Sequence, residues 1–310
     1  MSDFESTSPL PVPSRSRAIG GAREDQRLGA LRTFRYGRFI RKHWLGVISG
    51  STFGLIILAA MTAPWIAPHE PTEFLSVGPF AGPSPDAWLG TDQIGRDLLS
   101  RVLYGARTSL LIAISATTVG ILGGATLGLL SGYFGGWIDM LVQRLMDVLD
   151  AFPSLILAIL FVALMGASSV NVALAVAIVL IPGVNRVARS VVLGLRGLQY
   201  IEAANAIGAH PARVMLRHLA PGLVAPLSIV AAAAVGSAII TEASLSFLGL
   251  GPPPPTPTWG QMLSGDVRQY FITHPGLALI PGLALTLTVL SISLLGDSLR
   301  DALDPRLRRR

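Results

Sequence analysis

Long runs of apolar residues without Asp, Glu, Lys or Arg dominate the chain. They cover residues 45–67, 108–138, 151–185, 219–241 and 276–296. An α-helix rises about 1.5 Å per residue, so about 20 apolar residues cross the roughly 30 Å hydrocarbon core of a bilayer. The run 151–185 is long enough to cross twice, and buried helices of soluble proteins need only about 10–14 apolar residues. The pattern therefore predicts six membrane spans.

We place these spans near residues 44–67, 108–132, 139–166, 170–189, 221–242 and 276–298. All are expected to be helical, because the bilayer core holds no water to satisfy free backbone groups. The predicted fold class is an all-α polytopic membrane protein with one transmembrane domain over residues 44–300. A turn-rich patch at 166–171 separates the third and fourth spans. Asp92 is expected to cap the helix that leads into the second span.

The distribution of Lys and Arg predicts the orientation. Only 14% of residues are charged, against about 25% in soluble domains. Of the 24 Lys and Arg residues, all but Arg96, Arg101, Arg107 and Arg268 lie on one predicted side of the membrane. Positive residues favour the cytoplasmic side, so both termini and residues 190–220 are expected there. The net charge of +6 therefore needs no nucleic-acid partner.

The two ends of the chain are expected to lie outside the bilayer. Residues 1–29 are rich in Ser, Pro and Arg and predict a disordered cytoplasmic tail, with no pattern of a cleaved secretory signal. Residues 30–43 mix apolar residues with arginines and are expected to lie along the anionic inner surface. Residues 301–310 predict a basic cytoplasmic tail.

Catalytic chemistry is not supported by any motif. The chain has no Cys, which excludes disulfides and thiolate metal sites. Its only lysine, Lys42, follows Arg41, so the Gly-Lys-Ser/Thr of an ATP-binding P-loop is missing. Neither a His-Glu-x-x-His zinc pattern nor a Gly-x-Ser-x-Gly elbow occurs. We therefore expect no enzyme activity, catalytic residue, cofactor or metal in this chain.

A ridge of small residues follows the second span. It consists of glycines at four-residue spacing, Gly120, Gly124, Gly128, Gly132 and Gly136. Such a ridge lets another helix approach closely in a membrane. It indicates either packing within the chain or a sliding contact between spans or subunits, and the sequence leaves both open.

Acidic residues near the spans are the other candidates. Asp139, Asp147 and Asp150 lie nearly on one face at the start of the third span. Charges in spans often mark a pathway or a partner, but these could also be a solvated helix start. Glu242, at the outer end of the fifth span, indicates either the lining of an entrance or a simple interfacial position.

The predicted cytoplasmic segment 190–220 has the pattern of a helix-turn-helix. Gly208 suits the left-handed end of one short helix, and Pro211 suits the first turn of the next. Alanines around Glu202 give the first helix a flat surface that could fit a groove. From the residues alone, the segment is equally a docking knob or an amphipathic connector.

This segment resembles the coupling loop of binding-protein-dependent ABC importers, which has Glu-Ala-Ala, a glycine and a closing proline. The matching residues, with a histidine near the end of the loop, are Glu202, Ala203, Ala204, Gly208, His218 and Pro221. Other stretches are similar to the C-type permease subunits of dipeptide and oligopeptide importers. They lie at 89–97, 104–107, 151–154, 246–251, 255–260 and 296–305, so the resemblance covers about 30–308.

The resemblance implies a type I ABC importer permease fold in the bacterial inner membrane. It further implies a second related permease, two ATP-binding subunits and an extracytoplasmic solute-binding protein, with the ATPase docking at the coupling loop. Peptides are the expected substrate, and nickel chelates, opines or sugars are the alternatives.

Two other classes fit the sequence less well. A secondary transporter would favour ionisable residues near the bilayer midplane or interrupted helices in matching halves, and neither pattern is evident here. A structural assembly factor would leave the segment 190–220 without a role.

Overall fold

The structure is a computed structural model that describes residues 44–265, 270 and 272–303. The predicted disordered tail (1–29), the interfacial segment (30–43) and residues 304–310 of the basic tail lie outside the described residues. Residues 301–303 belong to the last helix and are not part of a separate tail.

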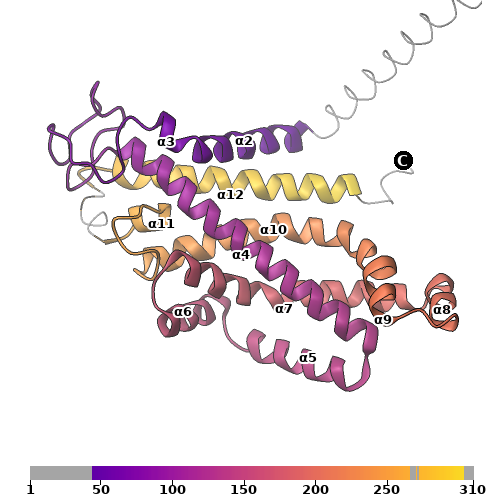
Figure 1. Cartoon of the computed structure of the whole chain (residues 1–310). Coiled ribbons are helices and arrows are strands. Elements are labelled where there is room, and N and C mark those ends of the chain that lie inside the picture. Colours follow the sequence, from indigo (N-terminus) through magenta and orange to yellow (C-terminus); the bar gives the residue numbers. More distant parts are fainter. Residues whose placement is uncertain (1–43, 266–269, 271, 304–310) are drawn as a thin grey trace, which may run out of the picture.

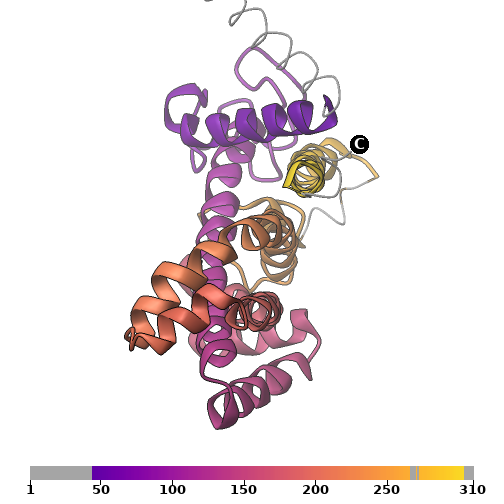
Figure 2. The same ribbon diagram turned by 90° about the vertical axis from the view of Figure 1, so that its right-hand side faces the viewer.

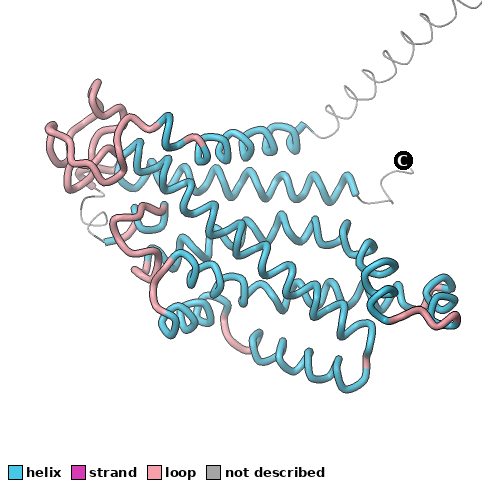
Figure 3. Tube along the Cα trace, viewed as in Figure 1, coloured by secondary structure: helices cyan, strands magenta, loops and turns pink. Residues whose placement is uncertain are grey.

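The described residues form helices joined by loops (Figures 1 and 3), and their only β-structure is a pair of isolated bridges. The helices are α2 (Trp44–Met61), α3 (Ala63–Ile66), α4 (Leu98–Phe134), α5 (Gly136–Asp150), α6 (Ser154–Met165), α7 (Ser169–Arg196), α8 (Gln199–Ala206), α9 (Pro211–Arg213), η1 (Val214–Leu219), α10 (Ala220–Phe247), α11 (Trp259–Met262) and α12 (Gly276–Leu303).

The long helices form an elongated bundle. In Figure 1, α2, α12, α10 and α7 follow one another down the view, and α4 crosses them diagonally. Contacts between these helices join α4 to α7, α10 to α12, and α12 to α2. Figure 2 looks along α12 and shows the same order from the end that carries α8.

The two ends of the bundle differ. Residues 67–97 and 248–264 gather at one end, which we call the loop end (Figure 3). Residues 197–219 protrude at the other end as a short helical hairpin, which we call the knob (Figure 1).

Within the described part of the chain, five helices are long and apolar enough to cross a membrane. They are Trp44–Met61, Leu98–Phe134, Ser169–Arg196, Pro211–Phe247 and Gly276–Ala302. Helices α5 and α6, of 15 and 12 residues, are each too short to span alone. They make a sixth candidate only as a pair, and they bend by 93° at their junction. The sequence therefore located the helical segments, but a continuous third span over 139–166 is wrong.

The junction between α5 and α6 has a local cause. Pro153 directly precedes α6, and a proline cannot donate the backbone hydrogen bond that would continue α5. It also disfavours helical backbone at Phe152. Hydropathy measures how apolar a segment is and not the direction of its helix axis. It therefore predicts one span where the structure has two helices.

The predicted cap of α4 is also corrected. The helix begins at Leu98, and the side chain of Asp97 accepts a hydrogen bond from the Ser100 N–H at 2.9 Å. Asp92 lies in the preceding loop, where it accepts hydrogen bonds from the N–H groups of Ile94 and Arg96. Both aspartates suit turns and caps, so residue type alone could not choose between them.

Candidate functional site

The knob is built from two short helices with a left-handed glycine between them. Gly208 has φ +76°. Its N–H donates to the Asn205 carbonyl, and the Ala209 N–H donates to the Ala204 carbonyl, both at 3.0 Å. This pair of bonds is the Schellman ending of a helix. Pro211 then opens α9, so the predicted helix end and helix start are confirmed.

One side of the knob is anchored in the bundle. Ile201, Val214 and Leu219 are fully buried and Ala204 nearly so. They share one apolar cluster with residues of α4, α7 and α10, namely Leu129, Ala188, Val192 and Leu223. Through its contacts with η1 and α7, this packing fixes α8 at the ends of the long helices.

The opposite side of the knob is exposed. Glu202, Ala203 and Gly208 are exposed there, and Ile207 at the tip is 86% exposed. Of the residues matched to the coupling loop, Ala204 instead faces inward. Pro221 is exposed in the first turn of α10, and the His218 ring lies 6.4 Å from that of Tyr200. The structure therefore separates an anchoring alanine from an exposed one.

The glycine ridge is filled by α7 of the same chain. A Cβ on Gly124 would lie 2.6 Å from the Val184 Cβ, and one on Gly128 would lie 2.7 Å from the Ala188 Cβ. Gly120 and Gly132 make similar approaches, each 2.9 Å from a Cβ of α7. These four glycines form a packing seam within the chain, and only glycine permits this separation of the two backbones.

Gly136 does not belong to the seam. It has φ +55°, and nothing lies within 4 Å of the position that its Cβ would take. Together with Gly135, at φ +65°, it makes the turn from α4 into α5. The four-residue spacing predicted a common face, but the helix had already ended at Phe134.

The acidic residues of α5 mostly pair with α7. The carboxylate of Asp139 accepts two hydrogen bonds from the Arg189 guanidinium, each 2.6 Å long. Asp150 forms an ion pair with Arg186, and Asp147 is exposed. Asp139 therefore holds α5 against α7, whereas Asp150 and Arg186 form an exposed pair at the other end of α5.

Glu242 lies in neither of its expected places. Its side chain is fully buried, and its Oε1 accepts a hydrogen bond of 2.7 Å from the Ser246 hydroxyl. Ser109 of α4 and Thr258 at the start of α11 lie beside the same carboxyl and are themselves buried. The residue is an interior contact between segments far apart in the sequence, which hydropathy could not show.

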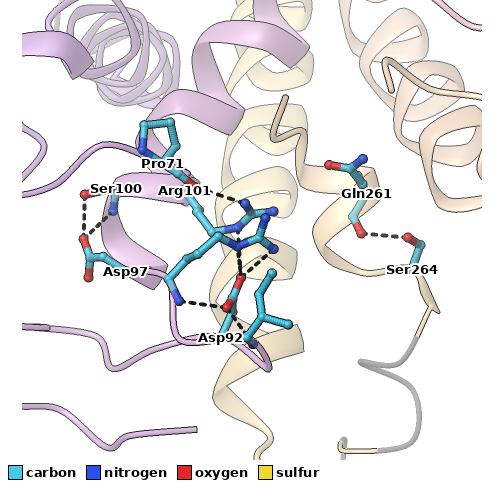
Figure 4. A network of polar contacts seen from close by, with 9 residues as sticks. Pro71, Asp92, Asp97, Ser100, Arg101, Gln261 and Ser264 are labelled. Carbon is cyan, nitrogen blue, oxygen red and sulfur yellow. Dashed lines mark hydrogen bonds and ion pairs between the residues drawn. The ribbon is translucent and has the colours of Figure 1, made fainter. Parts of the chain in front are cut away.

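The structure shows a charged network at the loop end that the sequence did not predict as a site. Asp92 Oδ2 accepts from Arg96 Nε at 2.7 Å and lies 3.4 Å from Arg101 Nε. Arg101 also donates to the Pro71 carbonyl at 3.2 Å (Figure 4). The four-residue spacing of Asp92 and Arg96 was a signal for the pair, whereas the contact with Pro71 depends on the fold.

This network borders a cavity of about 510 Å³. Arg96 and Arg101 line one side, and Gln261, Met262 and Ser264 of the segment around α11 line another. Figure 4 shows Gln261 and Ser264 to the right of Arg101, on a separate part of the chain. The loop end therefore holds a hollow whose wall combines polar and charged side chains with apolar ones, among them Pro252–Pro255 and Leu277.

Two family models match the chain. Residues 124–309 match the family model described as binding-protein-dependent transport system inner membrane component. Residues 36–83 match the N-terminal transmembrane domain of oligopeptide transport permease C.

Curated relatives span nearly the same length. A glutathione transport system permease protein of Pectobacterium atrosepticum is 45% identical over 87% of this chain and 90% of its own. A dipeptide transport system permease protein of Alkalihalophilus pseudofirmus is 42% identical over 87% of this chain and 88% of its own.

The fold has a counterpart among solved structures. A chain of the MetNI methionine ABC transporter, in an inward-facing conformation, superposes with a TM-score of 0.53 at 17% identity. It covers 67% of this chain and 98% of its own length. The relatives are permease components and not ATP-hydrolysing subunits, as the missing P-loop predicted. The chain belongs to the family of inner membrane components of binding-protein-dependent transport systems.

Proposed function

We propose that this chain forms half of a translocation pathway for di- or oligopeptides. A second related permease supplies the other half, and two ATP-binding subunits and an extracytoplasmic binding protein complete the importer. The names of the relatives, which refer to glutathione and dipeptides, support peptides over nickel chelates, opines or sugars. All of these relatives' names describe permeases, which supports a role in passage and not in ATP hydrolysis.

The observation that carries the proposal is the exposed face of the knob. Ile207 is a large apolar side chain that is 86% exposed, and burying it against a partner would contribute about 1.5–3 kcal/mol. Glu202 and Ala203 are exposed on the same short helix. A knob of this shape fits a cleft of an ATP-binding subunit.

The buried side of the knob explains how docking would drive transport. Ile201 and Ala204 belong to one apolar cluster with residues of α4, α7 and α10, so a displacement of α8 must move these helices or break the cluster. Closing of the ATP-binding subunits would therefore shift the bundle from an inward-facing to an outward-facing state. The shift is driven by ATP, because ATP binds the two states of the complex with different affinities.

Ile207→Asp is the test of this docking. The substitution places a charge in the expected cleft while disturbing no buried contact. We expect uptake of a radiolabelled dipeptide, and the ATP hydrolysis stimulated by the binding protein, to fall about tenfold or more. Both would be measured in the complete complex reconstituted in vesicles.

The matched control is Ile272→Asp, because Ile272 is 91% exposed shortly before α12 and lies outside the knob. This variant should retain wild-type stimulation. Normal stimulated hydrolysis with Ile207→Asp would refute docking through the knob, and equal losses in both variants would assign the effect to a general sensitivity to added charge.

The proposed orientation places both termini, the knob and residues 190–220 in the cytoplasm, with six passes over residues 44–300. Because the chain has no Cys, single cysteines report the topology directly. Asn205→Cys on the knob and Glu73→Cys at the loop end both replace exposed residues. A membrane-impermeant maleimide added to intact cells from outside is expected to label position 73 and not 205, and equal labelling of both would overturn the model.

A further inference from the structure

Glu242 is a buried carboxyl to which none of the transport steps above assigns a role. It is fully buried near the end of α10. Its neighbours are the hydroxyls of Ser246, Ser109 and Thr258, each at most 1% exposed. Its Oε1 accepts the Ser246 hydroxyl, whereas its Oε2 has no hydrogen-bond partner among the described residues. Burying a carboxyl is costly unless polar groups replace its water, so the surrounding hydroxyls lower the cost of keeping it in the interior.

The three hydroxyls come from three different elements. Ser246 belongs to α10 and Ser109 to α4, and Thr258 caps α11 by accepting a hydrogen bond of 3.1 Å from the Gln261 N–H. The cluster therefore joins two long helices to the segment 251–262 at one point.

The same segment is held close to α10 and α4 by its other contacts. Trp259 is 1% exposed, and its Nε1 donates to the Val102 carbonyl at 3.1 Å. Its backbone N–H donates to the Ser109 hydroxyl at 3.4 Å. A Cβ on Gly260 would collide with the backbone of Ala243, so the segment lies directly on the helix turn that carries Glu242.

The helix that carries Glu242 reaches the knob. α9, η1 and α10 follow one another without a break, and together they form a helix from Pro211 to Phe247. This helix starts at the knob turn and ends at the loop end (Figure 1). The segment it meets there provides Gln261, Met262 and Pro252–Pro255 to the wall of the 510 Å³ cavity.

We infer that Glu242 is a positioning residue that fixes the segment 251–262 to the helix 211–247, so that movement of the knob also moves one wall of the loop-end cavity. This inference rests on the proposed docking role of the knob. Its physical basis is that a fully buried polar contact, closed in by the buried Trp259 and by Gly260 against Ala243, has few alternative arrangements, and the two bodies that it joins therefore move together.

The experiment follows the cavity wall directly. Gln261→Cys introduces the only cysteine of the chain at a half-buried position in the wall. In the complete reconstituted complex, its labelling rate with a maleimide is measured without ATP and after trapping with ATP and vanadate. We expect the rate to change several-fold on trapping, and we expect Glu242→Ala to abolish this change while basal ATP hydrolysis persists.

Three further variants distinguish a positioning role of Glu242 from a general loss of folding or assembly. Glu242→Gln should restore the response, because an amide also donates to and accepts from hydroxyls. Ser246→Ala removes one hydroxyl from a helix that tolerates alanine, and it should weaken the response even if Glu242→Ala fails to assemble. Ser244→Ala is the control, because Ser244 is exposed and bonds only to its own helix at the Ile240 carbonyl.

Failure of the inference and failure of the proposed function give different results. A wild-type complex that imports peptide but shows no change at position 261 on trapping would overturn the inference alone. An unchanged response with Glu242→Ala or Ser246→Ala would overturn it as well. A wild-type complex that assembles with its partners and imports no peptide would overturn the proposed function.

Discussion

Replacing Gly128 by leucine is expected to lower the free energy of unfolding by about 3 kcal/mol or more. A Cβ at this position would lie 2.7 Å from both the Ala188 Cβ and the Asn185 carbonyl oxygen, and 2.9 Å from the Arg189 nitrogen. Two of these three atoms belong to the backbone of α7, which cannot rotate away as a side chain can. Helices α4 and α7 would therefore have to separate along the whole seam.

The size of this effect makes it visible in cells. Domains are stable by only about 5–15 kcal/mol, so the variant should be depleted from the membrane. We would measure the amount of full-length protein in solubilised membranes and the midpoint of thermal unfolding in detergent. Gly183→Leu is the control on α7, because nothing lies within 4 Å of its Cβ position. Equal stability of the two variants would contradict the assignment of the seam.

Removing the carboxylate of Asp139 should cost about 2–3 kcal/mol. Its side chain is 20% exposed and that of Arg189 is 31% exposed, so the pair is shielded from water more than a surface ion pair. Asp139→Ala would leave the Arg189 guanidinium without its two 2.6 Å hydrogen bonds, and α5 would lose its firmest contact with α7.

A double-mutant cycle measures the interaction itself. We expect Asp139→Ala and Arg189→Ala each to destabilise the chain, and the double variant to cost less than their sum. The observable is again the unfolding midpoint in detergent. Asp147→Ala is the matched control on α5, because Asp147 is exposed and should be nearly neutral. Additive effects at 139 and 189 would show that the pair contributes no coupling.

The break between α5 and α6 could be predicted from neighbouring residues only in part. Apolar residues continue through it, and Pro153 was visible in the sequence. Proline indicates that a helix is interrupted, but it does not give the angle, which is 93° here. The angle depends on what α5 packs against. That packing includes the Asp139–Arg189 and Asp150–Arg186 pairs, whose members are far apart in the sequence.

The sequence by itself determined the features that depend on neighbouring residues. The length of the charge-free apolar runs located the helices, and Gly208 and Pro211 located the knob turn. The missing Gly-Lys pair of a P-loop indicated that ATP hydrolysis belongs to other subunits. These predictions succeed because transfer into lipid and backbone preference are properties of short segments.

Only the tertiary structure decided which residues meet. It filled the Gly120–Gly132 seam with α7, moved the cap of α4 from Asp92 to Asp97, and turned Ala204 inward. It also buried Glu242 among hydroxyls of α4, α10 and the segment before α11. The physical reason is that the environment of a side chain is set by the helix opposite to it, and no single segment carries that information.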